Sequence, residues 1–340
     1  MKRASGWFCA LAWALSVSLS PAQDATPTET KVETVVSGLT DPAGIALQPE
    51  TGAVFVADSG AGRICRIVDG KLEAVIQGSP TEPSTSGGRA VGPLGLAFVD
   101  KQTLAVGDGG YKGDEDVVRI FKLPAEGDAT LGYEQAEAKL KPADGKKPQT
   151  PTGDWASLAL ARHGLYVVSP AGGGAVWKGA LKGTKFSDLE PVIDVAGKTS
   201  GAEATALALS PRGEVVLGLR GGDGDSSAAK LAFFSAKTHE SLLKLDCGLA
   251  AIAALAYSPK TGLLYALGSA ADSPDKVDLF RLDSDTTSGE QRIKAVKIAP
   301  LDQAAAMVFD KDGVAYITVR SKADASSDAP SGAVVKIAGL

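Results

Sequence analysis

One pattern of apolar and polar positions recurs six times along the chain. In each copy, a strand of alternating apolar residues is followed by a short turn rich in Pro, Gly, Asp or Lys and then by a second apolar strand. Equivalent apolar positions are separated by 51, 62, 49, 48 and 52 residues. These positions are Ile45, Leu96, Leu158, Leu207, Leu255 and Met307. A repeat of about 50 residues is typical of the blades of a β-propeller.

Each copy continues into a third apolar strand, and most continue into a fourth. The third strands are predicted at residues 63–68, 117–122, 175–178, 230–234, 277–282 and 333–337. The fourth strands are predicted at residues 72–76, 190–195, 242–245 and 294–298. A blade of four strands is the usual unit of a propeller.

The last repeat lacks a fourth strand of its own, because only three residues follow residue 337. Residues 31–36 have Val32, Thr34 and Val36 on one side, which suits an outer strand. We predict that this segment completes the last blade and closes the ring, so that no open sheet edge remains. A β-sandwich or a β-helix also has short strands at regular spacing, but a sandwich would not repeat one four-strand unit six times. The sequence therefore predicts an all-β protein with a single six-bladed propeller over residues 23–340, six blades being favoured over seven.

The interval of 62 residues is longer than the others because of an insertion between blades two and three. Residues 124–152 are rich in Pro, Lys, Gly and Glu and have no apolar period. This composition indicates a surface insertion rather than a further repeat.

The first 22 residues have the organisation of a secretory signal peptide. Lys2 and Arg3 precede an apolar stretch over residues 7–19, and the small residues Ser20 and Ala22 follow it. A membrane anchor is the alternative, but this stretch is well short of the ~20 apolar residues that span a bilayer. We therefore expect a secreted or periplasmic protein that does not insert into a membrane.

Charge and cysteine content narrow the partners further. Removal of residues 1–22 would change the formal net charge from -5 to -7, and the chain has no run of basic residues. Because binding to phosphates depends on clustered Lys and Arg, we exclude nucleic acid as a partner. Cys65 and Cys247 fall in blades on opposite sides of the ring, too far apart for a disulfide. We expect both to be small buried residues, although two cysteines in an exported protein can also pair.

Blade one resembles an NHL-type repeat. Its residues 41–67, DPAGIALQPETGAVFVADSGAGRICRI, carry Pro42 and Gly44 before the inner strand, Asp58 at the end of the second strand, and Arg63 with Ile64 at the start of the third. Blade two retains the corresponding Pro93, Gly95, Asp108, Arg119 and Ile120. The chain is thus similar to the group of six-bladed propellers that includes NHL-repeat, TolB-like and gluconolactonase-like proteins.

This resemblance implies two kinds of enzyme chemistry. The lactonases of the group hold a divalent cation in the central channel with Glu, Asp and Asn side chains, but this chain contains no asparagine. Quinone-dependent dehydrogenation needs a base, and the chain offers no candidate histidine, because His163 and His239 both fall in predicted hairpin turns. A lactonase-like hydrolase or lyase with a metal site in the channel remains the alternative hypothesis, with Asp58, Asp108 and Arg220 clustered around the axis. A channel lined by Ala, Ser and Leu would contradict that hypothesis.

The main hypothesis is a monomeric module that binds a protein or a glycan. The loops after the second strands all lie on one face, and they contain eleven acidic and five basic residues. The candidate binding residues are Asp58, Asp108, Asp114, Glu115, Asp116, Arg220, Asp223 and Asp225. No cofactor is predicted. Ca²⁺ bound at residues 114–116 or 223–225 is one alternative, and ordinary solvated loops are another.

Overall fold

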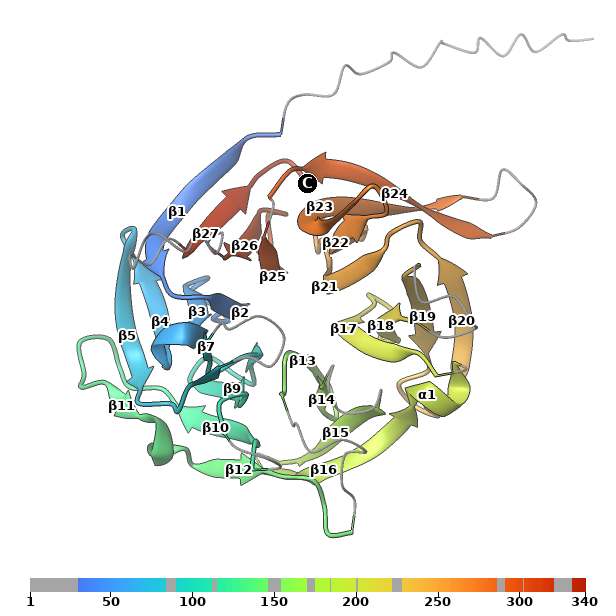
Figure 1. The fold of residues 1–340 in the computed structure, drawn as a ribbon. Coiled ribbons are helices and arrows are strands. Elements are labelled where there is room, and N and C mark those ends of the chain that lie inside the picture. Colours follow the sequence, from blue (N-terminus) through green and yellow to red (C-terminus); the bar gives the residue numbers. More distant parts are fainter. Residues whose placement is uncertain are drawn as a thin grey trace, which may run out of the picture.

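Six β-sheets are arranged as blades around a central axis (Figure 1). This computed structural model describes residues 30–83, 90–111, 115–145, 154–169, 175–183, 185–199, 201–221, 228–285, 291–301, 303–320 and 332–340. The predicted signal peptide lies outside these residues. In the part of the chain that is described, no helix is long and apolar enough to cross a membrane. The all-β, six-bladed propeller predicted from the sequence is confirmed.

The strands of each blade run antiparallel from the axis outward, in chain order. Blade one contains β2 (Pro42–Leu47), β3 (Val54–Asp58), β4 (Arg63–Val68) and β5 (Lys71–Gln77). Blade two contains β8 (Leu96–Phe98), β9 (Thr103–Gly107), β10 (Val118–Lys122) and β12 (Ala138–Leu140). Blade three contains β13 (Ser157–Ala161), β14 (Gly164–Val168), β15 (Ala175–Lys182) and β16 (Lys185–Asp194).

The second half of the ring follows the same plan. Blade four contains β17 (Glu203–Leu209), β18 (Val215–Arg220), β19 (Lys230–Phe234) and β20 (Ser241–Asp246). Blade five contains β21 (Ala251–Tyr257), β22 (Leu264–Ala270), β23 (Ser273–Asp285) and β24 (Arg292–Ala299). Blade six contains β25 (Ala304–Phe309), β26 (Ala315–Val319) and β27 (Gly332–Ile337). A single helical turn, α1 (Val195–Lys198), follows β16, and a short ribbon is formed by β6 (Glu82–Pro83) and β7 (Ala90–Val91).

The N-terminal strand closes the ring as predicted. Strand β1 (Val32–Leu39) pairs antiparallel with β27 and becomes the fourth strand of blade six, with Val32 opposite Ile337 and Val36 opposite Val334. Val36 is only 7% exposed, whereas Val32 near the start of the strand is 38% exposed. The first and last segments of the described chain therefore share one sheet, next to blade one.

The predicted insertion is built into the ring more closely than the sequence suggested. Its strand β12 pairs with β10 and supplies the fourth strand of blade two. Strand β11 (Leu131–Gly132) pairs parallel with β5 and so joins the insertion to blade one. Strands of two or three residues are too short to produce an apolar period, which explains why the sequence pattern missed them.

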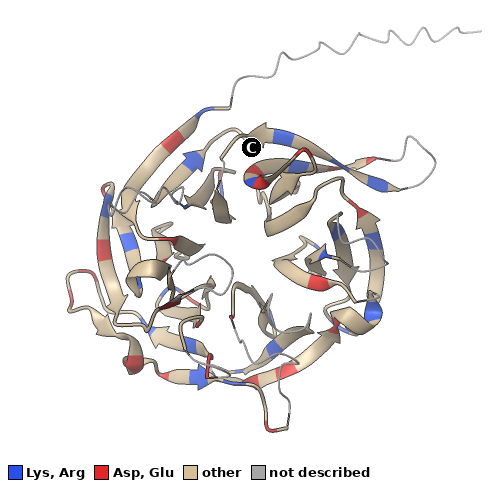
Figure 2. Ribbon diagram, viewed as in Figure 1, with Lys and Arg blue, Asp and Glu red and all other residues tan. Residues whose placement is uncertain are grey.

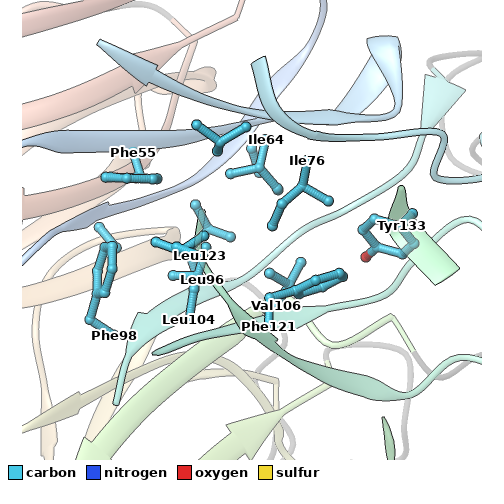
Figure 3. Packing of buried hydrophobic residues seen from close by; sticks show 13 residues of the cluster. Phe55, Ile64, Ile76, Leu96, Phe98, Leu104, Val106, Phe121, Leu123 and Tyr133 are labelled. Atoms are coloured by element: carbon cyan, nitrogen blue, oxygen red, sulfur yellow. The ribbon is translucent and has the colours of Figure 1, made fainter. Parts of the chain in front are cut away.

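Hydrophobic clusters between neighbouring blades form the core. Figure 3 shows the cluster between blades one and two, in which Phe55 and Phe98 meet edge to face with their ring centroids 5.0 Å apart. Ile64, Phe121 and Tyr133 are buried in the same cluster. Lys, Arg, Asp and Glu lie mainly on the outer strands, and the inner strands around the axis carry little charge (Figure 2).

The two cysteines belong to this apolar packing. Cys65 and Cys247 are both buried and neither is in a disulfide, as predicted. Burial raises the pKa of each thiol to about 11, so both stay protonated at neutral pH. They act as small apolar side chains.

Close to the axis, hydrogen bonds connect every pair of adjacent blades. The six donor and acceptor pairs are Gly44 N–Leu94 O (2.9 Å), Gly95 N–Trp155 O (3.1 Å), Leu207 N–Ser157 Oγ (3.2 Å), Thr205 Oγ1–Ile252 O (2.7 Å), Gln303 Nε2–Asp275 O (3.1 Å) and Thr318 Oγ1–Ala43 O (2.7 Å). The first of these needs glycine, because a Cβ atom at Gly44 would lie 2.1 Å from the Leu94 carbonyl oxygen. Adjacent blades are thus fixed relative to one another near the axis.

Ring closure by β1 can be tested with two substitutions in that strand. The change Val36→Asp would place an unpaired carboxylate among the apolar side chains between blades six and one, and we expect it to lower the free energy of unfolding by about 2–4 kcal/mol. The matched control Val32→Asp changes an exposed position, and we expect it to have little effect. Thermal and urea unfolding followed by circular dichroism would measure both. Equal destabilisation by the two variants would contradict the closure.

Candidate functional site in the central channel

A cavity of about 510 Å³ lies on the axis of the ring. The inner strand of every blade contributes to its wall, which consists mainly of Ala, Gly and Leu residues. Its polar side chains are those of Ser157, Thr205, Arg220, Gln303 and Arg320. A volume of this size is in the range that accommodates small-molecule ligands.

The two hydroxyl groups of the lining take part in holding the ring together. Ser157 Oγ accepts a hydrogen bond from Leu207 N, and Thr205 Oγ1 donates to Ile252 O. Both side chains are therefore oriented by bonds between blades. The arginines are the only charged groups among the described residues of the lining.

The two arginines occupy corresponding positions in blades four and six. Arg220 ends β18 opposite Glu203, and its guanidinium donates to Glu203 Oε2 at 2.6 Å. Arg320 follows β26, and its backbone N–H donates to the Gln303 carbonyl at 3.0 Å. Both inner strands have an irregularity at the same place, between Ala204 and Ala206 and between Ala304 and Ala306. Of these two arginines, only Arg220 was predicted as a site residue, although aligning the two repeats would also identify Arg320.

Asp58 lies inside blade one rather than in the channel wall. Its side chain is 0% exposed and forms an ion pair with Arg63, with 2.8 Å between Asp58 Oδ2 and the guanidinium. Asp58 Oδ1 also accepts a hydrogen bond from Thr40 N. Burial raises the pKa of this carboxyl group, and the bonds to Thr40 and Arg63 oppose the rise. The Asp58 carboxylate therefore joins the start of β4 to the loop before β2.

Asp108 is the centre of a buried charged network in blade two. It accepts from Arg119 Nε at 3.0 Å and from the Tyr133 hydroxyl at 2.7 Å. The Arg119 guanidinium lies over the rings of Tyr111 and Tyr133, at 4.8 and 4.9 Å from their centroids, and is paired with Glu134. Because Tyr133 and Glu134 belong to the predicted insertion, this network fastens the insertion to the blade. Burial raises the pKa of Asp108 to about 6, although Arg119 opposes the rise.

The other predicted binding residues are distributed differently. Asp116 is 3% exposed and accepts a hydrogen bond from Tyr111 N, whereas Glu115 is exposed. Asp114, Asp223 and Asp225 lie outside the described residues. Of the proposed trio of Asp58, Asp108 and Arg220, only Arg220 reaches the channel, so the predicted cluster around the axis is wrong. The wall is mostly Ala, Gly and Leu, which contradicts a catalytic site built from that trio and leaves Arg220 and Arg320 as its charged groups.

The residues present do not fit the divalent cation that the resemblance to lactonases implies. Among the described residues, no group of three or more His, Cys, Asp or Glu side chains could hold a metal ion. The channel wall offers the guanidinium groups of Arg220 and Arg320, which repel a cation, instead of the carboxylates that hard cations prefer.

The residues also do not fit quinone-dependent dehydrogenation, which requires a base in the channel. His163 lies in the exposed turn between β13 and β14. His239 lies in the turn between β19 and β20, and its Nε2 is 3.2 Å from the Tyr166 hydroxyl. Neither of the two histidines of the chain lines the channel.

The buried carboxyl group of Asp116 predicts a pH dependence of stability. Burial, together with Asp154 and Asp108, raises its pKa from 3.8 to about 7. The folded state then binds a proton more tightly than the unfolded state, so stability falls as the pH rises from about 4 to 7. The change Asp116→Asn keeps the acceptor for Tyr111 N and removes the charge.

We therefore expect Asp116→Asn to unfold at a higher temperature than the wild type above about pH 7, and at a similar temperature near pH 4. Differential scanning calorimetry across this pH range would measure the difference. The exposed Asp272→Asn is the matched control. The account would be contradicted if Asp116→Asn were no more stable than the wild type at the higher pH.

Comparison with known proteins identifies the fold group. No protein-family model matches the chain, and no curated protein matches it. A solved structure of a glucose dehydrogenase-type oxidoreductase from Thermus thermophilus is 18% identical, with a TM-score of 0.60, over 91% of this chain and 99% of that one. A gluconolactonase from Xanthomonas campestris is 14% identical, with a TM-score of 0.58, over 91% and 89% of the two chains. An aldose sugar dehydrogenase from Streptomyces coelicolor is 14% identical, with a TM-score of 0.56, over 92% and 99%.

The comparisons and the burial of the acidic residues overturn the main hypothesis of a binding module. Three carboxylates assigned to the acidic loop face, those of Asp58, Asp108 and Asp116, are buried within blades and cannot form a docking surface. The similar structures bear the names of sugar lactonases and sugar dehydrogenases, and none of these three is named as a binding module. At identities below 20%, this likeness concerns the fold. The chain has the six-bladed propeller fold shared by gluconolactonase-like and NHL-like proteins.

Proposed function

We propose that the protein is a lactonase-like hydrolase that opens a sugar lactone in the central channel. The observation that carries the proposal is the cavity of about 510 Å³ on the axis, with two guanidinium groups in an otherwise mainly apolar wall. Two of the similar folds are named gluconolactonases, one of them the Xanthomonas campestris enzyme.

The proposed reaction needs a group that stabilises negative charge on oxygen. The oxygen of water bonds to the lactone carbonyl carbon, the ring C–O bond breaks, and a proton from the water passes to the departing oxygen. The carbonyl oxygen carries the negative charge of the intermediate, and a guanidinium can donate hydrogen bonds to it.

Arg220 is the residue that we assign to this role. Its ion pair with Glu203 orients the guanidinium at the wall and leaves further N–H donors for a ligand. Glu203 is 43% exposed and contacts this lining arginine, so its carboxylate is our candidate for receiving the proton from water. Serine nucleophile chemistry has less support, because the hydroxyl group of Ser157 is engaged between blades.

The channel location can be tested by filling the cavity. Ala253 lines the channel and its side chain is exposed to it, so Ala253→Phe adds bulk there without entering the core. We expect the wild type to hydrolyse one or more lactones of a sugar-lactone panel faster than the uncatalysed reaction. We expect Ala253→Phe to lower kcat/KM by about tenfold or more, mainly through KM.

The matched control for this test is Ala138→Phe, at an exposed position on the outer strand β12. We expect this variant to retain wild-type kinetics, and both variants to unfold at the wild-type temperature. A pH-indicator assay with the spontaneous rate subtracted would give the values. The proposal fails if no lactone is hydrolysed above background, or if Ala253→Phe is as active as the control.

A further inference from the structure

The two channel arginines form a repeated feature of the ring. Each lies three residues after the second-strand residue that pairs with the inner repeat position, which is Leu217 in blade four and Ile317 in blade six. Blade five, between them, has the neutral Ser269 at the corresponding place, opposite Ala251. Two guanidinium groups are therefore held on the same loop face of the channel, and the blade between them has a neutral residue at that position.

The residues that lie opposite the two arginines in the strand pairs differ in charge. Glu203 faces Arg220 across the strand pair, and Gln303 occupies the same position beside Arg320. Together, these four side chains carry one negative and two positive charges. Arg320 Nε also approaches Pro42 O at 3.4 Å, but a guanidinium has five N–H donors and can bind several partners.

The rest of the wall favours an anion over a cation. No acidic side chain is found among the described residues that line the cavity. Small apolar residues make up most of the remaining wall, and the Arg220 side chain is 57% exposed, so its guanidinium is accessible to a ligand that enters the cavity. Arginine and carboxylate groups match in geometry, because two parallel N–H···O bonds can form between them.

We infer that the channel binds a carboxylate-bearing sugar through Arg220 and Arg320, and that it does so without a divalent cation. The binding part of this inference is independent of the proposed function, and the substrate part rests on it. If the protein is the proposed hydrolase, its substrate is the lactone of a sugar acid that keeps a second, free carboxylate. One arginine would hold that carboxylate, and the other would face the lactone carbonyl.

Calorimetric titration tests the binding part of the inference. The probes are D-glucarate, which carries two carboxylates, and D-glucitol, its uncharged analogue, each in buffer with excess EDTA. We expect glucarate to bind at least about tenfold more tightly than glucitol, and added salt to weaken it. We expect Arg220→Gln and Arg320→Gln each to weaken glucarate binding about tenfold.

Two further variants make the titration decisive. Arg212→Gln, in an exposed turn, is the matched control and should bind glucarate like the wild type. Ala253→Phe should block glucarate binding, which keeps the inference testable if an arginine variant fails to fold. The inference is overturned if glucarate does not bind, if EDTA abolishes its binding, or if both arginine variants bind as the wild type does.

A kinetic comparison separates this inference from the proposed function. The substrates are D-glucarolactone, which keeps a free carboxylate, and D-gluconolactone, which has none. A higher kcat/KM for glucarolactone that is lost in Arg320→Gln supports both. Faster hydrolysis of gluconolactone that is unaffected by Arg320→Gln overturns the inference, whereas the proposed hydrolase function still stands. Binding of glucarate through the arginines without hydrolysis of either lactone overturns the hydrolase and leaves the carboxylate site.

Discussion

The pairing of β1 with β27 is the interaction on which the rest of the structure depends. It joins the two ends of the described chain in one sheet and leaves no blade open at the seam. The six hydrogen bonds between neighbouring blades then fix the blades near the axis, including Thr318 Oγ1 to Ala43 O across that seam. Because every blade contributes to the wall of the cavity, the channel site exists only in the closed ring.

The aspartates buried in the blades and the arginines of the channel occupy second-strand positions that differ by one residue. Asp58 and Asp108 lie two residues after Val56 and Val106, and Arg220 lies three residues after Leu217. Asp58 and Asp108 are buried inside their blades, where they are paired with Arg63 and Arg119, whereas Arg220 lies in the wall of the channel.

The repeat pattern was sufficient to predict the blades, the closing strand and the unpaired cysteines, because apolar alternation and blade spacing determine all three. It was not sufficient for β11 and β12, whose pairing depends on contacts of Tyr133 and Glu134 with blade two. The loop sequences suggested an acidic surface, since composition does not reveal that Asp116 is buried. Arg320 was missed as a site residue because loop charges were considered together, without the alignment of individual blades.

The central claim is that the ligand site is on the axis, between the guanidinium groups of blades four and six. A crystal structure of the protein with bound D-glucarate tests it most directly. The account predicts a carboxylate of the ligand within hydrogen-bond distance of Arg220 or Arg320, inside the cavity formed by the six inner strands. Glucarate bound on the outer strands or on the loop surface, with the channel free of ligand, would contradict it.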